Sequence, residues 1–196
     1  MIHSLDIKSR EETVFPNYVV ELTTKIQYDP VGQQLLIYTN YGTLFALSKD
    51  GKHISILIGY IEMNDFEYSP GLGVIFYTTD YAVKSCNMDG SNELTLFNST
   101  VTKFEKIALD LPAKRIFYTT TGMPDTVKRV MSSKLDGSDK FRHYTIPIKN
   151  QQSPTIQIFE NGIIITDASK SSPVYHSKKV QLRPIFWALH SQKWTE

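Results

Sequence analysis

Short runs of alternating apolar and polar residues, bounded by Gly, Pro, Asn or Asp, fill most of the chain. Such alternation indicates half-buried β-strands, and no segment keeps the 3.6-residue spacing of an amphipathic helix. The clearest stretch is 65–97, where an Asp-Gly turn between apolar runs is a strong hairpin signal. This stretch predicts a four-stranded antiparallel unit. Its expected strands are near Phe66–Tyr68, at Val74–Thr79, near Val83–Met88 and at Leu94–Phe97.

The same arrangement recurs at a spacing of about forty residues. The pentapeptide IFYTT occurs at Ile75–Thr79 and again at Ile116–Thr120, the related LIYTN occupies 36–40, and a weaker fourth copy follows at 156–179. Four-stranded units at this spacing are typical of β-propeller blades, in which such a strand fills the space between blades. An irregular sandwich with chance similarity is the alternative. Each of the first three copies ends in an Asp-Gly pair: Asp50-Gly51, Asp89-Gly90 and Asp136-Gly137.

A known family carries this order of features. The Asp-Pro turn, the aromatic and threonine-rich strand and the Asp-Gly-Ser turn resemble the class B, or YWTD, repeat of the low-density-lipoprotein-receptor family, which includes lipoprotein receptors and Wnt co-receptors. Residues 106–140 are the best copy, 153–179 resemble the family's last blade, and 183–192 are similar to the strand leading into an EGF-like module. The resemblance implies an all-β fold: a partial six-bladed YWTD-type β-propeller with about four and a half four-stranded blades.

The resemblance also implies a division of the chain. We expect the end of one blade, three blades, a last blade and an exit strand toward a missing EGF-like module. Their bounds are 1–22, 23–59, 60–100, 101–148, 149–180 and 181–196. Because the chain opens in the middle of a blade, it is expected to be a fragment of a longer receptor. A truncated product without independent function is the alternative.

The chain departs from the family signature in the strand that carries it. The family Trp is replaced by Tyr38, Tyr77 and Tyr118. The family Asp is replaced by Asn40, Thr79 and Thr120, and only Asp167 keeps the carboxylate. In the family this Asp ties neighbouring blades through hydrogen bonds, so each loss is expected to cost roughly 1 kcal/mol if the new side chain only partly replaces it.

Charge and hydropathy narrow the classes of function. The formal net charge is +1 without long blocks of like charge, which argues against nucleic acid or a membrane surface as an electrostatic partner. The longest apolar run, Ile54–Ile61, is too short to span a bilayer, and the residues after Met1 lack the apolar core of a signal peptide. An extracellular or cell-surface location is therefore implied by the family resemblance alone. If Met1 is the true start, the product would stay in the cytosol.

Motifs for catalysis or metal binding are scarce. The five histidines form no HExxH motif or close pair and are expected at the surface, and GLG at 71–73 lacks the helix of a nucleotide-binding loop. Cys86 is expected to be a buried structural thiol. We predict no catalytic residue, cofactor or metal. A calcium-dependent lactonase, another six-bladed propeller with its metal on the central axis, is the enzymatic alternative. Asn98 begins an Asn-Ser-Thr sequon for N-glycosylation just after a strand.

One rim of the propeller is predicted to bind ligand. Residues just before the first strand of an antiparallel blade and just after the second share one end of the sheet. Their mixture of aromatic, methionine and carboxylate side chains is typical of protein-binding patches. Packing of these side chains between loops and neighbouring blades is the alternative. The expected residues of this face are Tyr41, Glu62, Met63, Tyr81, Phe104, Glu105 and Met123.

The family resemblance gives this face a function. It implies a non-catalytic receptor propeller that takes extracellular protein ligands on the rim beside the YWTD strand ends. The ligand classes are a Wnt-type protein, a secreted antagonist or a lipoprotein, which connects the chain to Wnt signalling or endocytosis. Adjacent EGF-like modules would be partners within a longer parent chain. No nucleic acid and no membrane contact within this segment are expected.

Overall fold

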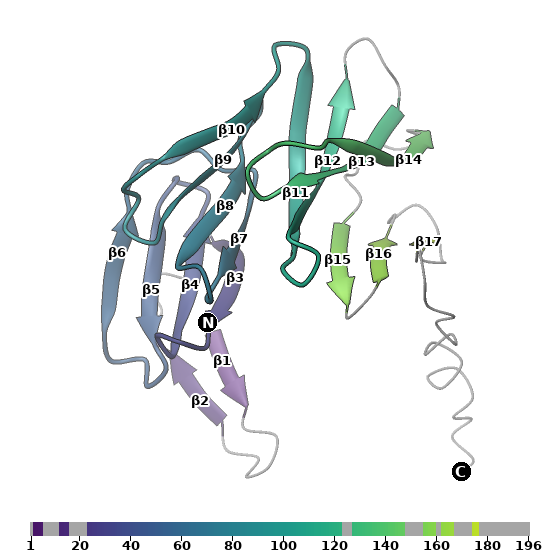
Figure 1. The fold of residues 1–196 in the computed structure, drawn as a ribbon. Helices are drawn as coiled ribbons and strands as arrows, with labels where there is room; N and C mark the ends of the chain where they lie inside the picture. Colours follow the sequence, from purple (N-terminus) through teal and green to yellow (C-terminus); the bar gives the residue numbers. More distant parts are fainter. Residues whose placement is uncertain are drawn as a thin grey trace, which may run out of the picture. The chain divides into compact units, whose positions relative to one another are not determined.

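The protein is described by a computed structural model, in which residues 2–5, 12–15, 23–122, 127–147, 155–159, 162–166 and 174–176 are placed. Every regular element in these ranges is a β-strand (Figure 1). The chain forms two compact units, Met1–Ile148 and Lys149–Glu196. In the first unit β1 (Ile2–Leu5) and β2 (Glu12–Phe15) form a hairpin. The described part of the second unit is a sheet of β15 (Thr155–Phe159), β16 (Gly162–Thr166) and β17 (Val174–His176).

Within the described ranges, three four-stranded antiparallel sheets follow one another along the first unit. The first sheet contains β3 (Thr23–Asp29), β4 (Gln34–Thr39), β5 (Leu44–Ser48) and β6 (Ile54–Ile58). The second contains β7 (Asp65–Ser69), β8 (Val74–Thr78), β9 (Ala82–Asn87) and β10 (Leu94–Asn98). The third contains β11 (Thr102–Asp110), β12 (Arg115–Gly122), β13 (Val127–Lys134) and β14 (Phe141–Pro147).

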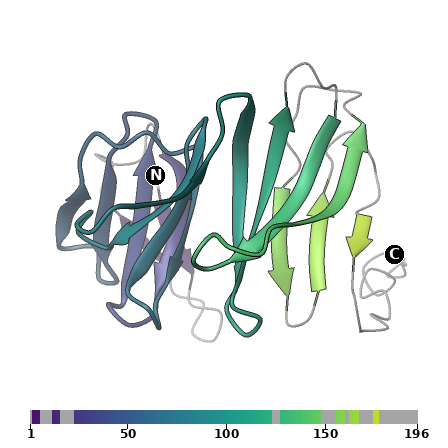
Figure 2. The same ribbon diagram turned by 45° about the horizontal axis from the view of Figure 1, so that its top comes forward.

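Each of these sheets is a simple meander in which consecutive strands pair. The second sheet lies between the first and the third, as both views show (Figures 1 and 2). The prediction of an all-β, propeller-like fold is therefore confirmed. The exit strand expected at 181–196, together with Asp167 and Met123, lies outside the described residues.

The recurring IFYTT strand owes its composition to burial on both faces. Side chains alternate between the two faces of a strand, and in β8 Ile75 and Tyr77 face the first sheet while Phe76 faces the third. In β12, Ile116 and Tyr118 pack back against the second sheet in the same way. All five side chains are buried, which confirms that the pentapeptide is a packing motif.

Two hydrophobic clusters fill the spaces between the sheets. The cluster between the first and second sheets consists of Leu36, Tyr38, Leu44, Ala46, Met63, Phe66, Tyr68, Ile75, Tyr77 and Cys86. The cluster between the second and third sheets consists of Phe76, Val83, Phe97, Phe104, Ile107, Ile116 and Tyr118. Aromatic rings meet edge-on or tilted in both, as with Tyr38 and Phe66 at 6.2 Å between centroids. Such pairs add to the stabilisation from burial alone.

The Asp-Gly turns between the third and fourth strands reverse the chain, and the turn of the third sheet also packs against the preceding sheet. In the third sheet Asp136 Oδ1 accepts hydrogen bonds from the backbone N–H (2.9 Å) and the hydroxyl (2.6 Å) of Ser138. Gly137 adopts a φ of +82°, and a Cβ there would lie 2.7 Å from the carbonyl oxygen of Leu96 on β10. The turn of one sheet thus packs against the outer strand of the sheet before it, and only glycine fits.

Replacing Gly137 with Ala should therefore lower the free energy of unfolding by about 2–3 kcal/mol, because strain at positive φ adds to the clash with Leu96. Gly73→Ala is the matched control. Gly73 also has a positive φ (+66°) but open space around it, so about 1 kcal/mol from backbone strain is expected. Urea unfolding followed by circular dichroism measures both. Equal losses in the two variants would contradict close packing of the turn on β10.

Candidate functional site

Four chain segments, three loops and the turn that runs into the start of β11, meet at the end of the sheets where the second strands finish and the first strands begin. We call residues 40–43, 59–64, 79–81 and 99–105 the rim. The amide of Ile61 donates to the carbonyl of Gly42 (2.8 Å), which joins the first two segments. The amide of Phe104 donates to the carbonyl of Asp80 (3.0 Å), which joins the last two. Each of these backbone bonds joins the loop after a second strand to the segment that leads into the next sheet.

Asn64 is the central connection of the rim. Its backbone N–H donates to the carbonyl of Thr78 (2.8 Å), and its side-chain Nδ2 donates to Asp80 Oδ1 (3.0 Å) and to the carbonyl of Phe104 (2.8 Å). One side chain therefore links the end of β8 to β11 of the next sheet. No sequence signal indicates this role, because a lone Asn before a strand is an ordinary turn residue.

The buried side chain of Tyr38 holds the 59–64 segment of the rim in place. Its buried hydroxyl donates to the carbonyl of Ile61 (2.8 Å) and accepts from the backbone N–H of Met63 (2.8 Å). Burial raises the pKa of the Tyr38 phenol, so the group stays protonated and keeps its donor. A Trp at this position has a donor and no acceptor. Tyr38, which stands where the family has Trp, therefore binds this loop both as a donor, to Ile61, and as an acceptor, from Met63.

Three tyrosines project from the rim. Tyr41, Tyr60 and Tyr81 are 71%, 96% and 49% exposed. Tyr41 and Tyr60 each flank the hydrogen bond between Gly42 and Ile61, which places them on neighbouring loops. Tyr60 was missed by the sequence prediction because it belongs to the apolar run 54–61. Its φ of +57° and the preceding Gly59 mark a turn within that run.

Charged groups surround the tyrosines. Lys103 Nζ pairs with Asp80 Oδ2 at 2.8 Å and lies 5.9 Å from the centroid of the Tyr81 ring. Hydrogen bonds from Lys103 and Asn64 hold the pKa of the Asp80 carboxyl below its usual range, and the bond to Asp80 raises the pKa of Lys103. Glu62 is exposed beside Ile61. The rim therefore combines exposed rings with fixed charges of both signs.

Two predicted members of the binding face are core residues instead. Met63 is 7% exposed and belongs to the cluster between the first and second sheets. Phe104 is 4% exposed and its ring lies 5.6 Å from Phe97 and 5.8 Å from Tyr118, between centroids. The prediction that these two side chains are surface anchors is wrong. Packing between loops and neighbouring blades, the alternative interpretation, applies to both.

The error at Phe104 comes from the start of β11. This strand begins at Thr102, so Phe104 and Glu105 lie inside it, where side chains alternate between the two faces. The half-buried carboxylate of Glu105 is bound by Lys128 Nζ (2.9 Å) and by the hydroxyl of Thr121 (3.1 Å). Tyr41, Glu62 and Tyr81 are the predicted residues that the structure places exposed on the rim.

Asp65 joins all three sheets, a role that no sequence motif indicated. Its Oδ1 accepts from Lys25 Nζ on β3 (2.8 Å), and its Oδ2 accepts from the backbone N–H of Ile107 on β11 (3.1 Å). Lys25 also pairs with Glu67 at 2.8 Å. Burial alone would lower the pKa of Lys25, but the two carboxylates outweigh it and raise that pKa. The ammonium group is thus held charged between the sheets.

The hydrogen bond between blades that the resemblance led us to expect is made by the residue one position earlier in the strand. The hydroxyl of Thr78 donates to the carbonyl of Glu105 on the next sheet (2.9 Å). Thr79, at the position of the family Asp, instead accepts from the backbone N–H of Ala82 (3.0 Å) within its own turn. Asp65 and Thr78 are therefore among the residues that form hydrogen bonds between sheets in this chain.

Other candidate groups are structural. Ser132 Oγ lies 2.7 Å from His143 Nε2 and accepts from Arg115 Nε (3.0 Å), but Ser132 is fully buried, so no substrate can reach it. His143 is half-buried between the rings of Phe117 and Phe141, which corrects the surface position expected for it. Where side chains are described, at 23–122 and 127–145, no group of three or more His, Cys, Asp or Glu is placed to hold a metal ion.

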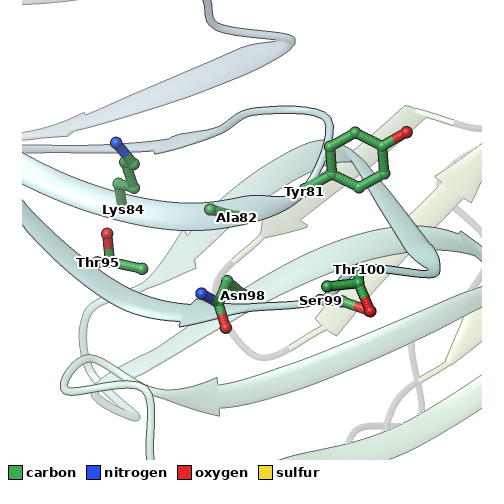
Figure 3. A pocket seen from close by; sticks show the side chains of 7 residues that line it. All are labelled: Tyr81, Ala82, Lys84, Thr95, Asn98, Ser99 and Thr100. Atoms are coloured by element: carbon green, nitrogen blue, oxygen red, sulfur yellow. The ribbon is translucent and has the colours of Figure 1, made fainter.

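Asn98 is the last residue of β10 and is exposed. It borders a shallow open groove of about 490 Å³ between the ends of β9 and β10 (Figure 3). The lining residues are Tyr81, Ala82, Lys84, Thr95, Asn98, Ser99 and Thr100. The groove adjoins the rim, since Tyr81, Ser99 and Thr100 belong to both.

Comparison with known proteins concerns the fold. No protein-family model and no curated protein matches the sequence. A chain of the nidogen/laminin complex is 13% identical, with a TM-score of 0.58, over 87% of this chain and 81% of that chain. The β-propeller domain of Cps50 (Swd1) from Myceliophteria thermophila is 12% identical, with a TM-score of 0.56, over 90% of this chain and 64% of its own.

A third similar structure is an auxiliary nutrient binding protein from Bacteroides thetaiotaomicron. It is 10% identical, with a TM-score of 0.61, over 90% of this chain and 49% of that protein. The chain thus spans two thirds or less of the last two structures. At these identities the likeness establishes a β-propeller domain, and the low-density-lipoprotein-receptor family remains a resemblance.

Loss of the Asp65 carboxylate should destabilise the protein. Asp65→Ala is expected to lower the free energy of unfolding by about 3 kcal/mol, because Lys25 and the amide of Ile107 lose a buried partner. Asp65→Asn should lose about half as much, since its amide oxygen can still accept from Ile107. Urea titration measures both. Asp139→Ala, which breaks a solvent-exposed pair with Arg115, is the control and should have a much smaller effect. A loss as large in the control would contradict the role of Asp65.

Cys86 should be unreactive in the folded protein. The prediction of a buried structural thiol is confirmed: Cys86 is 2% exposed in the first cluster, and burial raises the pKa of its thiol to about 11. At pH 8 the native thiol should react with a disulfide reagent roughly 100-fold more slowly than in urea-unfolded chain. The native rate should keep rising above pH 9, where an ordinary thiol levels off. Cys86 is the single cysteine, so the signal is unambiguous. Fast labelling of folded protein would contradict the assignment.

Proposed function

We propose that this chain is the ligand-binding part of a non-catalytic, extracellular receptor propeller of the low-density-lipoprotein-receptor type. In this proposal the rim takes a protein ligand, and EGF-like modules adjoin the propeller in a longer parent chain. The supporting observation is the set of three exposed tyrosines on loops that are hydrogen-bonded across sheets. None of the described segments forms a helix long and apolar enough to cross a membrane.

Tyrosine suits this function for physical reasons. Its ring supplies a large contact area with only two rotatable side-chain bonds, so little conformational entropy is lost on binding. Tyr, Trp and Arg dominate the energetic centres of protein interfaces. On the rim, Tyr38 and Asn64 fix the loops below the exposed rings, so the surface is ordered before ligand arrives. Preordering reduces the entropic cost of association.

The charges of the rim favour a protein partner over a lipid or nucleic-acid one. Asp80 and Lys103 form a pair, and Glu62 adds a second carboxylate, so the rim carries no excess of positive charge. Anionic lipid and nucleic acid require clustered Lys and Arg. A mixed polar surround of aromatic anchors is typical of protein interfaces. Wnt-type proteins, secreted antagonists and lipoproteins are the ligand classes that the family resemblance supplies.

Binding can be measured with the full 196-residue chain immobilised on a biosensor. The probes are a purified Wnt-type protein, a secreted antagonist of that pathway and lipoprotein particles. At least one should bind, and Tyr41→Ala, Tyr60→Ala and Tyr81→Ala should each weaken it by about tenfold, as for residues at an interface centre.

Leu94→Ala serves as the matched control, because Leu94 is 62% exposed on β10 and lies off the rim. It should leave binding unchanged, and circular dichroism should show every variant folded. The proposal fails if no probe binds, or if the control loses as much affinity as the tyrosine variants.

A further inference from the structure

The sequon at Asn98 occupies a position that an N-linked glycan requires. Phe97 is buried against Phe104 and Tyr118, and because side chains alternate along a strand, the next residue points outward. Asn98 is exposed and ends β10. Because the ring of Phe97 is buried in the core, the side chain of Asn98 points away from the core.

The turn that follows presents the rest of the motif. The backbone N–H of Ser99 donates to the carbonyl of Tyr81 (2.9 Å), and Ser99 Oγ accepts from the backbone N–H of Val101 (3.3 Å) and of Thr102 (3.0 Å). Ser99 is thus used within the turn, while Thr100 is exposed. Among the residues that the structure describes, neither the side-chain carboxamide of Asn98 nor the hydroxyl of Thr100 has a hydrogen-bond partner.

The groove beside Asn98 provides room for a bulky group. Its lining mixes small and polar side chains with the ring of Tyr81, and it opens to solvent (Figure 3). Asn98 pairs with Ala82 on β9, so the neighbouring strand offers only a methyl group at this level. Directly opposite Asn98, an attached sugar therefore meets only the methyl group of Ala82, and Lys84 lies further along the groove.

We propose that Asn98 carries an N-linked glycan seated at this groove. The Asn98 Nδ2 attacks the anomeric carbon of a lipid-diphosphate-linked oligosaccharide. The nitrogen–carbon bond forms, the bond from that carbon to the phosphate oxygen breaks, the lipid diphosphate leaves with the electron pair, and the amide gives up one proton. The modification rests on the proposed extracellular location, because the transfer occurs in the secretory compartment.

The glycan also has a defined relation to the proposed ligand surface. Asn98 lies on β10, the strand at the opposite edge of the second sheet from β7. The rim residues Tyr41, Glu62 and Tyr60 belong to loops beside β4 and β7. The glycan therefore borders the rim at Tyr81 and at the 99–105 segment, and Tyr41 and Tyr60 stay accessible.

The test uses the whole chain behind a cleavable secretion signal in cells that perform N-glycosylation. Asn98-Ser99-Thr100 is the single sequon of the sequence, so one glycan is expected. Amidase treatment should remove the mass shift and convert Asn98 to Asp within the tryptic peptide Ser85–Lys103, which mass spectrometry detects. Asn98→Gln and Thr100→Ala should abolish the shift. Thr100→Ser, which keeps the motif, should retain it.

A control variant reports on the compartment. In the Asn98→Gln background, Leu94→Thr creates a second sequon at Asn92, an exposed turn residue. A glycan at Asn92 together with an unmodified Asn98 in the wild-type chain would overturn the Asn98 proposal and leave the receptor function standing. Absence of glycan at both positions in material retained inside the cell would overturn the Asn98 site and the extracellular location together.

Discussion

Each inner sheet of this protein must be apolar on both faces, and the rest of the structure follows from that requirement. β8 meets the first sheet through Ile75 and Tyr77 and the third sheet through Phe76. A strand with two buried faces cannot alternate apolar and polar residues, so its sequence becomes a continuous apolar run. The same run recurs in β12, where Ile116 and Tyr118 pack against the second sheet. The pentapeptide therefore repeats because each copy packs against a neighbouring sheet.

Stacking also accounts for the order of the rim. Loops at sheet ends are usually the most mobile part of a β-fold. In this chain the loops are joined across sheets by Asn64, by the Tyr38 hydroxyl and by backbone hydrogen bonds. The exposed tyrosines are therefore mounted on segments that the core holds in place. The buried contacts beneath the rim therefore keep its loops in a fixed conformation.

The sequence was sufficient for the features that depend on local pattern. Alternation, Asp-Gly turns and the repeat spacing predicted four-stranded sheets, and the family resemblance at the position of Cys86 predicted its burial. Long-range polar contacts were not predictable. Asp65 reads as an ordinary charged residue at a strand start, and only the approach of β3 and β11 makes it a shared partner.

Strand boundaries limited the prediction of the site. The face was placed just before the first strand, but β11 starts at Thr102, which moved Phe104 into the core. The side chain of Met63 lies in the cluster between the first and second sheets, and its backbone N–H is bound by the Tyr38 hydroxyl. Tyr60 lies near the end of the apolar run 54–61, of which β6 covers only Ile54–Ile58. Each error is a shift of a few residues, which is enough to exchange an inward side chain for an outward one.

Asp65 has a further consequence for the way the three sheets unfold. Proteins built from stacked units behave approximately as one-dimensional arrays, in which each unit is stabilised by its immediate neighbours alone. The two hydrophobic clusters fit that description, since each lies between one pair of sheets. Asp65 does not, because its two oxygens bind groups on the sheets to either side of its own. It adds a coupling that spans three units. Such a coupling disfavours states in which an end sheet has opened alone, and it favours cooperative unfolding of the three sheets.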